Sequence, residues 1–274
     1  MDPIQTMVNG LPGNVARVVA EHVARDDRFA LLPASLTGPE ITDDACRIHQ
    51  TTIELIRPDR RRAAVEQLRR DHGPFICVDY THPSAVNGNA AFYCRHELPF
   101  VMGTTGGDRE KLFQTVRDSA TAAVIAPNMA KQIVGFQAMM EWAAANLPDL
   151  FKGYRLTIRE SHQQGKADTS GTAKAMIACF NKLGAAFSAD AIRMERDPQR
   201  QKTEWGIPEA HLAGHGWHTY TLRSPDDTVL FRFTHNVNGR DIYAAGTLDA
   251  LMFLKRKIDQ GAKGRVYSMI DVIK

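Results

Sequence analysis

Short apolar runs alternate with helix-like patterns over the first 130 residues of the chain. Apolar residues recur at three- and four-residue spacing from residue 14 onward and again across 60–70, which predicts amphipathic helices. The runs between and after them are short and rich in β-formers, and they lie at 4–9, 29–32, 51–56, 75–80, 100–102 and 121–126. Because strands that alternate with helices are typical of βαβ units, we predict an α/β fold with a Rossmann-like, doubly wound parallel sheet.

The pattern changes after residue 128. A long helix is predicted over 129–146, a half-buried strand over 154–160 and a helix from near Thr172. Residues 216–223 and 228–236 predict an antiparallel pair, and a helix over 240–260 precedes a short strand near Val266. We therefore expect a dinucleotide-binding domain at 1–129 and 240–274. A second, α+β domain with an open mixed sheet is expected at 130–239.

Composition narrows the class of protein. The 274 residues are 43% hydrophobic and 24% charged with a net charge of +3, so disorder is excluded and neither a nucleic acid nor a membrane is an expected partner.

The four cysteines lie far apart, which favours a reducing compartment. His211, His215 and His218 lack a completing carboxylate or cysteine, so no metal is expected. An apolar segment follows Met1 almost at once, so we expect no transit peptide and a cytoplasmic protein.

The first predicted strand leads into a glycine turn. Gly10 and Gly13, followed by Asn14, stand between that strand and the first helix. A tight turn that brings the backbone close, with free N–H groups at a helix N-terminus facing the negative charge, suits a pyrophosphate. The spacing is G-x-x-G-x-x-A, which an ordinary strand-to-helix turn would also satisfy. Its place at the first βα turn favours dinucleotide binding.

The second predicted strand bears on the choice of cofactor. A carboxylate after this strand would hold the ribose 2′-hydroxyl of NAD, yet no acid occurs before Glu40. Ser35 or Thr37 could instead bond a 2′-phosphate. We therefore expect NADPH, with NADH as the alternative because no arginine stands at this place.

Loops that follow later strands supply further cofactor candidates. The carboxyl edge of an open α/β sheet is where its ligand binds. The candidates in these loops are Thr81, Gly103, Thr104, Thr105, Ala126, Asn128 and Met129.

The segment 160–176 carries the candidate chemistry. Ser170, Gly171 and Thr172 open a predicted helix, where free N–H groups and hydroxyls suit a carboxylate. His162 and Lys166 precede them and could supply a proton donor and a cation. A capped helix after a polar loop is the alternative interpretation.

This segment resembles the signature of the dihydrodipicolinate reductase family, whose bacterial pattern is E-x-H-H-x-x-K-x-D-A-P-S-G-T-A. The shortened D-T-S-G-T-A at 168–173 is similar to the plant-type branch. The runs at 8–13, 78–83, 100–108 and 126–129 are similar to that branch too, in order along nearly the whole chain.

The resemblance implies an NAD(P)H-dependent reductase of a cyclic imine dicarboxylate in lysine and diaminopimelate biosynthesis, assembled as a homodimer or homotetramer through its second domain. His162 would be the site histidine and Lys166 the proton donor. Gln163 stands where the bacterial pattern has a second histidine, and Gln can still donate and accept. Gln163 and Arg240 would contact the substrate with Ser170, Gly171 and Thr172. Two alternatives stay open: a reductase of another cyclic imine or amino-acid-like substrate, and a non-catalytic NADPH sensor.

Overall fold

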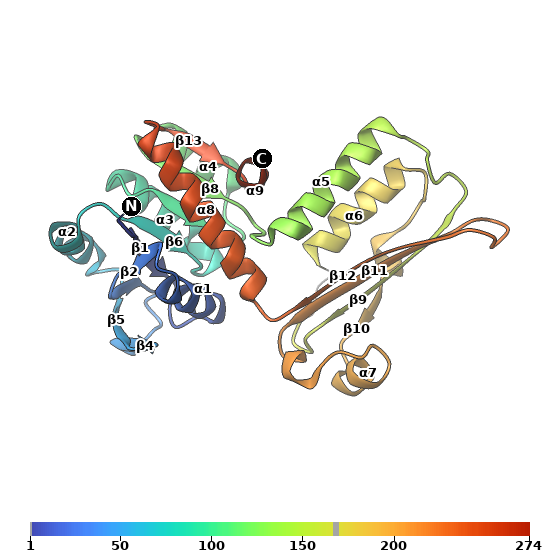
Figure 1. The fold of residues 1–274 in the computed structure, drawn as a ribbon, viewed down its shortest axis with the longest axis horizontal. Coiled ribbons are helices and arrows are strands. Elements are labelled where there is room, and N and C mark those ends of the chain that lie inside the picture. The colour runs from blue at the N-terminus through green and yellow to red at the C-terminus, as the bar shows by residue number, and fades with distance from the viewer. Residues whose placement is uncertain (1, 167–169) are drawn as a thin grey trace. The chain divides into compact units, whose positions relative to one another are not determined.

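The computed structural model describes residues 2–166 and 170–274. The chain divides into two compact units, one formed by Met1–Lys131 with Asp241–Lys274 and the other by Gln132–Arg240 (Figure 1). Among the described residues, no helix is both long and apolar enough to cross a bilayer.

The first unit is built on a six-stranded sheet in which every paired strand is parallel. Its central strands are apolar without alternation, because helices cover both faces. The order across the sheet is β13 (Arg265–Tyr267), β8 (Ala122–Ile125), β7 (Phe100–Met102), β6 (Ile76–Asp79), β1 (Ile4–Asn9) and β2 (Phe29–Leu31). The predicted α/β class and parallel sheet are confirmed.

Two sets of helices flank this sheet. Helices α1 and α8 pack on each other, and the apolar side chains of α2, α3 and α4 join one core with alternate residues of the central strands. Asp108 caps α4 by accepting the amide of Lys111, which fixes where that helix begins. The helices are α1 (Asn14–Arg25), α2 (Arg61–His72), α3 (Val86–Arg95), α4 (Arg109–Arg117), α8 (Asp241–Asp259) and α9 (Met269–Ile273).

The strand predicted at 51–56 forms, but not in the main sheet. It is β5 (Thr51–Ile56), and it pairs with β3 (Ala34–Leu36) and β4 (Ala45–Ile48) in a separate three-stranded sheet. The chain between β2 and α2 is thus a small subdomain. Its β3 is hydrogen-bonded to the end of β1, because the Gly10 amide donates to the carbonyl oxygen of Leu36.

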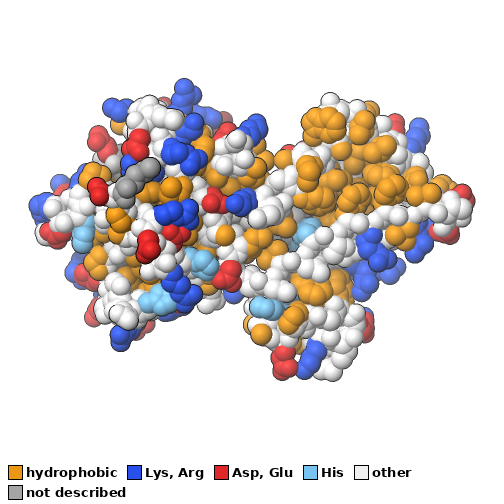
Figure 2. Space-filling view, in the orientation of Figure 1, with side chains coloured by type: hydrophobic (Ala, Val, Ile, Leu, Met, Phe, Trp, Pro, Cys, Tyr) orange, Lys and Arg blue, Asp and Glu red, His pale blue; other side chains and the backbone are white. Residues whose placement is uncertain are grey.

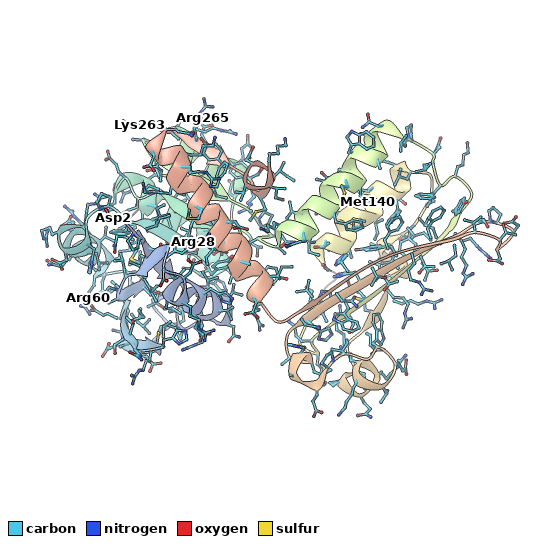
Figure 3. The ribbon with its side chains drawn as sticks, viewed as in Figure 1. Asp2, Arg28, Arg60, Met140, Lys263 and Arg265 are labelled. Carbon is cyan, nitrogen blue, oxygen red and sulfur yellow. The ribbon has the colours of Figure 1, made fainter. Side chains whose placement is uncertain are left out.

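The second unit is a four-stranded mixed sheet with helices on it. In order the strands are β10 (Arg193–Glu195), β9 (Arg155–His162), β11 (His215–Arg223) and β12 (Leu230–Asn238). β10 runs parallel to β9 and the other pairs are antiparallel. Helices α5 (Lys131–Asn146) and α6 (Gly171–Lys182) share one apolar core with this sheet, into which Met140 projects from α5 (Figure 3). The short α7 (Pro198–Thr203) follows β10.

The register of the second sheet positions the candidate chemistry. His218 on β11 stands opposite Glu160 on β9, and Gly216 stands opposite His162. A Cβ at Gly216 would lie 3.4 Å from Nε2 of His162, so the missing side chain leaves room for that ring.

Candidate active site

The glycine turn after β1 has no room for larger side chains. Gly10 has a φ of +100°, and a Cβ there would lie 2.3 Å from the carbonyl oxygen of Tyr80. A Cβ at Gly13 would lie 2.8 Å from the carbonyl oxygen of Gly10. Gly13 and Asn14 are exposed where α1 begins, so the turn presents backbone to an approaching anion. This cradle fits the pyrophosphate of a dinucleotide.

Ser35 and Thr37 support this turn through their hydroxyl groups. The hydroxyl of Ser35 accepts the Leu11 amide at 3.3 Å, and the hydroxyl of Thr37 donates to the Leu11 carbonyl at 2.8 Å. Ser35 is fully buried, so it has no surface for a 2′-phosphate. We correct its assignment from a cofactor contact to a residue that holds the Leu11 peptide in place.

The turn lies at the point where the strand order of the sheet reverses, since β1 is the neighbour of both β2 and β6. Asp79, fully buried at the end of β6, organises this edge. Its carboxylate accepts four side-chain hydrogen bonds, and the donors are Thr81 at 2.8 Å, Asn89 at 3.0 Å, Tyr93 at 2.7 Å and Thr104 at 2.7 Å. The candidates Thr81 and Thr104 are therefore held on one carboxylate.

The other cofactor candidates follow β7 and β8. A Cβ at Gly103 would collide with the Tyr80 ring at 2.3 Å, and Thr105 is exposed. Ala126 and Met129 are buried. The part-buried Asn128 accepts the Ala130 amide at 2.9 Å and thereby shapes the bend before α5.

In the second unit the structure brings most of the catalytic and substrate candidates together. His162 is the last residue of β9, and the amide of Lys166 closes a turn by donating to the carbonyl of Gln163 at 3.0 Å. Ser170 is the N-cap residue of α6, followed by Gly171 and Thr172. Arg240 comes between β12 and α8, with its guanidinium beside Gly214. The signature residues 167–169 lie outside the described residues.

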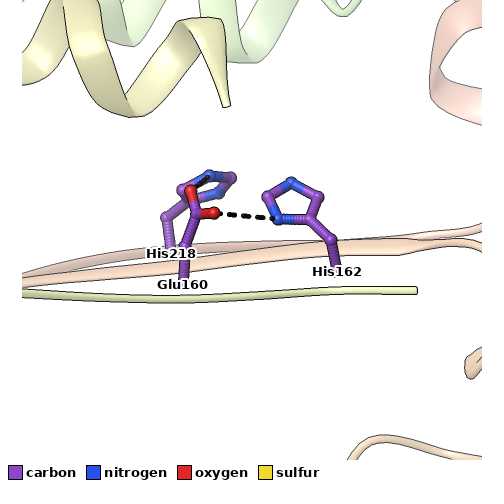
Figure 4. A group of neighbouring side chains, drawn as sticks. All are labelled: Glu160, His162 and His218. Carbon is purple, nitrogen blue, oxygen red and sulfur yellow. Dashed lines mark ion pairs between the residues drawn. The ribbon is translucent and has the colours of Figure 1, made fainter. Parts of the chain in front are cut away.

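Glu160, which the sequence reasoning did not select, lies at the centre of this group (Figure 4). Its fully buried carboxylate is 3.6 Å from Nδ1 of His162 and 3.6 Å from Nε2 of His218. Both separations are too long for hydrogen bonds, and each is an ion pair when the histidine is protonated. Burial alone would raise the pKa of Glu160, but its contacts with His162, His218 and Arg196 outweigh burial and hold the pKa well below the usual range.

Glu160, His162 and His218 each offer a ligand atom within 4.8 Å of the others, a grouping that can hold a metal ion. Arg196 already donates to the Glu160 carboxylate at 2.6 Å, so a metal would have to share that carboxylate with a guanidinium. His211 and His215 belong to a different arrangement, in which His215 contacts the hydroxyl of Ser161 and the carbonyl of His211. The expectation of no metal stays a prediction.

Sequence reasoning also missed Arg196, Gln201 and His235. The Gln201 amide donates to the carbonyls of His162 and Glu195, and His235 stacks on His218 with ring centroids 4.6 Å apart. Arg196 and Gln201 fall in a polar stretch without a catalytic pattern, so only their contacts identify them.

The first unit is a parallel sheet with a glycine cradle at its switch point, as in dinucleotide-binding proteins. The second unit has a loop with His162 and Lys166 beside a helix N-terminus. Together they indicate an NAD(P)H-dependent oxidoreductase. Residues 4–129 match the family described as "Dihydrodipicolinate reductase, N-terminus", and residues 133–273 match the corresponding "C-terminus". The chain belongs to the dihydrodipicolinate reductase family.

Relatives agree along nearly the whole chain. A rice protein named "Probable 4-hydroxy-tetrahydrodipicolinate reductase 1, chloroplastic" is 47% identical over 98% of this chain and 78% of its own. An Arabidopsis thaliana 4-hydroxy-tetrahydrodipicolinate reductase 1, also chloroplastic, is 45% identical over 99% of this chain and 78% of its own. A dipicolinate-bound dihydrodipicolinate reductase from Paenisporosarcina sp. TG-14 has the same fold, with a TM-score of 0.68 at 18% identity over 98% of this chain and 99% of its own.

These relatives contradict the expectation of a cytoplasmic protein. Four plant relatives, 45–47% identical to this chain, are named as chloroplastic enzymes. Widely spaced cysteines and a mild charge favour a reducing compartment, and they do not separate the cytoplasm from other such compartments.

Proposed function

We propose that His162 and Lys166 carry out the reaction of this family, the NAD(P)H-dependent reduction of 4-hydroxy-tetrahydrodipicolinate to tetrahydrodipicolinate in lysine biosynthesis. The main support is the position of these two residues between β9 and α6, where they precede a helix N-terminus. The free N–H groups of that N-terminus, with Ser170 and Thr172, would bind a substrate carboxylate. Gln163 and Arg240 would contact the same dicarboxylate.

Each side chain has a distinct role in this scheme. Bound NAD(P)H supplies the hydride. The 4-hydroxyl group of the substrate leaves as water, and Lys166 donates a proton to the substrate ring, so that the negative charge left by the hydride is quenched. His162, whose Nδ1 lies 3.6 Å from Oε1 of Glu160, orients the substrate. On the cofactor side, Gly10, Gly13 and Asn14 face the pyrophosphate, while Thr81, Gly103, Thr104, Thr105, Ala126, Asn128 and Met129 border the nicotinamide and its ribose.

We propose NADPH as the preferred cofactor. The support is the sequence 29–39, which has no acid to repel a 2′-phosphate after β2. NADH is the alternative, because the hydroxyls of Ser35 and Thr37 are engaged by Leu11.

The protein is proposed to work as a homodimer or homotetramer. Large apolar side chains are exposed on the second unit, including Met139 and Trp142 on α5 at 64% and 62% exposure (Figure 2). Leu230 and Phe231 on β12 are exposed as well. Exposed apolar groups of this size favour association. Sedimentation of the purified protein tests this, and a monomer at micromolar concentration would contradict it.

The test of activity follows the loss of reduced-nicotinamide absorbance. Substrate is generated in the cuvette from pyruvate and aspartate semialdehyde by the synthase that precedes this reaction, with NADPH and NADH compared side by side. Lys166→Ala should lower kcat about 100-fold or more, because a general acid contributes on that order. Lys182→Ala, at the end of α6, is the matched control. Absence of turnover in the unmodified protein would reject the activity, and an unimpaired Lys166→Ala would reject the role of Lys166.

A different cyclic imine is the second candidate substrate. Gln163 favours it, because a neutral amide stands where the bacterial signature has a histidine. Turnover of another imine with a higher kcat/KM than 4-hydroxy-tetrahydrodipicolinate would establish it.

A further inference from the structure

Arg196 contacts three separate segments of the second unit. Directly after β10, its side chain is only 18% exposed. Nη2 donates to Oε1 of Glu160 at 2.6 Å, and Nε donates to the backbone carbonyl of Lys166 at 2.8 Å. Nη1 donates to the backbone carbonyl of Glu195 at 3.0 Å. One guanidinium therefore ties β9, β10 and the turn that carries Lys166 to one another.

The carboxylate that Arg196 contacts is itself connected to the rest of the candidate site. Oε1 of Glu160 lies 3.6 Å from Nδ1 of His162, and Oε2 accepts the backbone amide of Ser170 at 3.4 Å. Ser170 is the N-cap residue of α6. Glu160 and Arg196 together thus contact both proposed catalytic residues and the start of the helix proposed to bind the substrate carboxylate.

We propose that the buried Glu160–Arg196 pair is the positioning device of this site: it fixes Lys166 through its backbone carbonyl, and it holds His162 and the N-terminus of α6 through the carboxylate. The inference rests on the proposed function, since it assigns a role relative to Lys166 and His162. Neither Glu160 nor Arg196 is placed against substrate.

The geometry favours positioning over simple charge balance. A guanidinium presents donors in a rigid plane, so it can hold a carboxylate and two carbonyls at fixed angles. An ammonium in its place would keep the charge but not this planar set of three hydrogen bonds. Because Lys166 is reached through its main chain, loss of Arg196 would shift the proton donor without removing it. A shift of about 1 Å can cost about 100-fold in rate.

Kinetic constants of variants in the intact protein test the pair. Arg196→Gln should lower kcat about 10- to 100-fold, while the Kd for NADPH, held by the other unit, stays unchanged. Arg196→Lys should lower kcat nearly as much. If Arg196 served only to balance the charge of Glu160, lysine would restore kcat. Arg200→Gln is the matched control, because Arg200 also lies beside Glu195 but contacts neither Glu160 nor Lys166 in the described structure.

A double-mutant comparison separates positioning from general damage to the fold. In a Lys166→Ala background, Arg196→Gln should cost much less in kcat than it does alone, because the residue it positions is already gone. Equal losses in the two backgrounds, or an Arg196→Gln variant with unchanged kcat, would overturn the proposal. If the buried Glu160 charge prevents Arg196→Gln from folding, the double variant Glu160→Gln/Arg196→Gln removes both charges, and it should fold and show the same kcat loss.

Amide hydrogen exchange gives a measurement that does not depend on turnover. Arg196→Gln should speed exchange of the Lys166 and Ser170 amides while β9 stays protected, and Arg200→Gln should not. If the unmodified protein shows no reductase activity, the proposed function fails, yet this exchange result still decides the positioning role. Unchanged exchange at both amides would overturn it.

Discussion

The hydroxyl of Tyr93 donates to Oδ2 of Asp79 at 2.7 Å, and both side chains are fully buried. Burial, followed by the neighbouring charge of Asp79, raises the pKa of Tyr93 well above its usual value, so the hydroxyl stays protonated and remains a donor. The same hydroxyl oxygen accepts a hydrogen bond from the side-chain amide of Asn9 at 3.0 Å. The end of β1 and the end of β6 are therefore joined through one phenol.

Asp79→Asn should destabilise the first unit and weaken cofactor binding. The carboxylate is surrounded by donors, so an amide would direct its own N–H groups at some of them. Leaving such groups unpaired in a buried site costs about 1–3 kcal/mol. Urea unfolding and NADPH titration measure both effects. Tyr93→Phe removes one hydrogen bond to this carboxylate and the one from Asn9, and it leaves the carboxylate with its other donors, so it should show a smaller loss. Equal stability of Asp79→Asn and the unmodified protein would contradict the role given to this carboxylate.

Gly10→Ala should abolish tight NADPH binding. The new Cβ would overlap the Tyr80 carbonyl in a backbone conformation that alanine rarely adopts. Gly88→Ala on α3 is the control, because nothing lies within 4 Å of a Cβ there and a helical alanine is favoured by about 1 kcal/mol. Fluorescence titration with NADPH should separate the two variants. Normal affinity in Gly10→Ala would show that the turn is not the pyrophosphate cradle.

Ser35→Ala distinguishes support of the glycine turn from contact with a 2′-phosphate. Since Ser35 is buried and bonds the Leu11 amide, its loss should weaken NADPH and NADH binding by the same factor. A neutral hydrogen bond is worth about 1 kcal/mol, which corresponds to about fivefold in Kd. Paired titrations of the two nucleotides measure that ratio. A loss confined to NADPH would restore the 2′-phosphate role that we have withdrawn.

The sequence predicts the elements that carry long apolar signals and misses those created by tertiary pairing. The run that became β7 is apolar throughout, as a buried parallel strand is. The runs that became β1 and β5 contain polar residues, but their β-branched residues still predict strands. β10 has the sequence Arg-Met-Glu and is a strand only because it pairs with β9. The separate sheet of β5 depends likewise on partners that a local pattern does not specify.

The same limit applies to the site. His162 and Lys166 stand in a recognisable motif, whereas Arg196 is 30 residues beyond Lys166 in a stretch that is polar throughout. The hydroxyl of Ser35 was expected at the correct end of β2, but the direction in which it points depends on how β3 packs beside the Leu11 peptide. The sequence gives the type of each residue, but how far a side chain is buried and where it points are known only from the folded chain.

His235 should make the second unit less stable as pH falls. Burial first, and then the positive charges of His218 and His162, lower the pKa of His235 to about 4. In the unfolded chain the pKa of a histidine is about 6.5, so as pH falls the unfolded chain takes up a proton at a higher pH than the folded chain does. Stability from this histidine is therefore complete above about pH 6.5 and is lost as pH falls toward about 4. For this partly exposed ring we expect a loss of about 1–2 kcal/mol at pH 5.

Urea unfolding between pH 7 and pH 5, followed by a probe of the second unit, measures this effect. His235→Gln removes the titrating ring, so its unfolding free energy should fall less over that range than that of the unmodified protein. Because burial also lowers the pKa of His215 and of His218, part of the dependence should remain. His72→Gln, on the exposed end of α2 in the other unit, should leave the pH dependence of the second unit intact. A pH dependence that is the same in His235→Gln and the unmodified protein would show that His235 takes up no extra proton on unfolding.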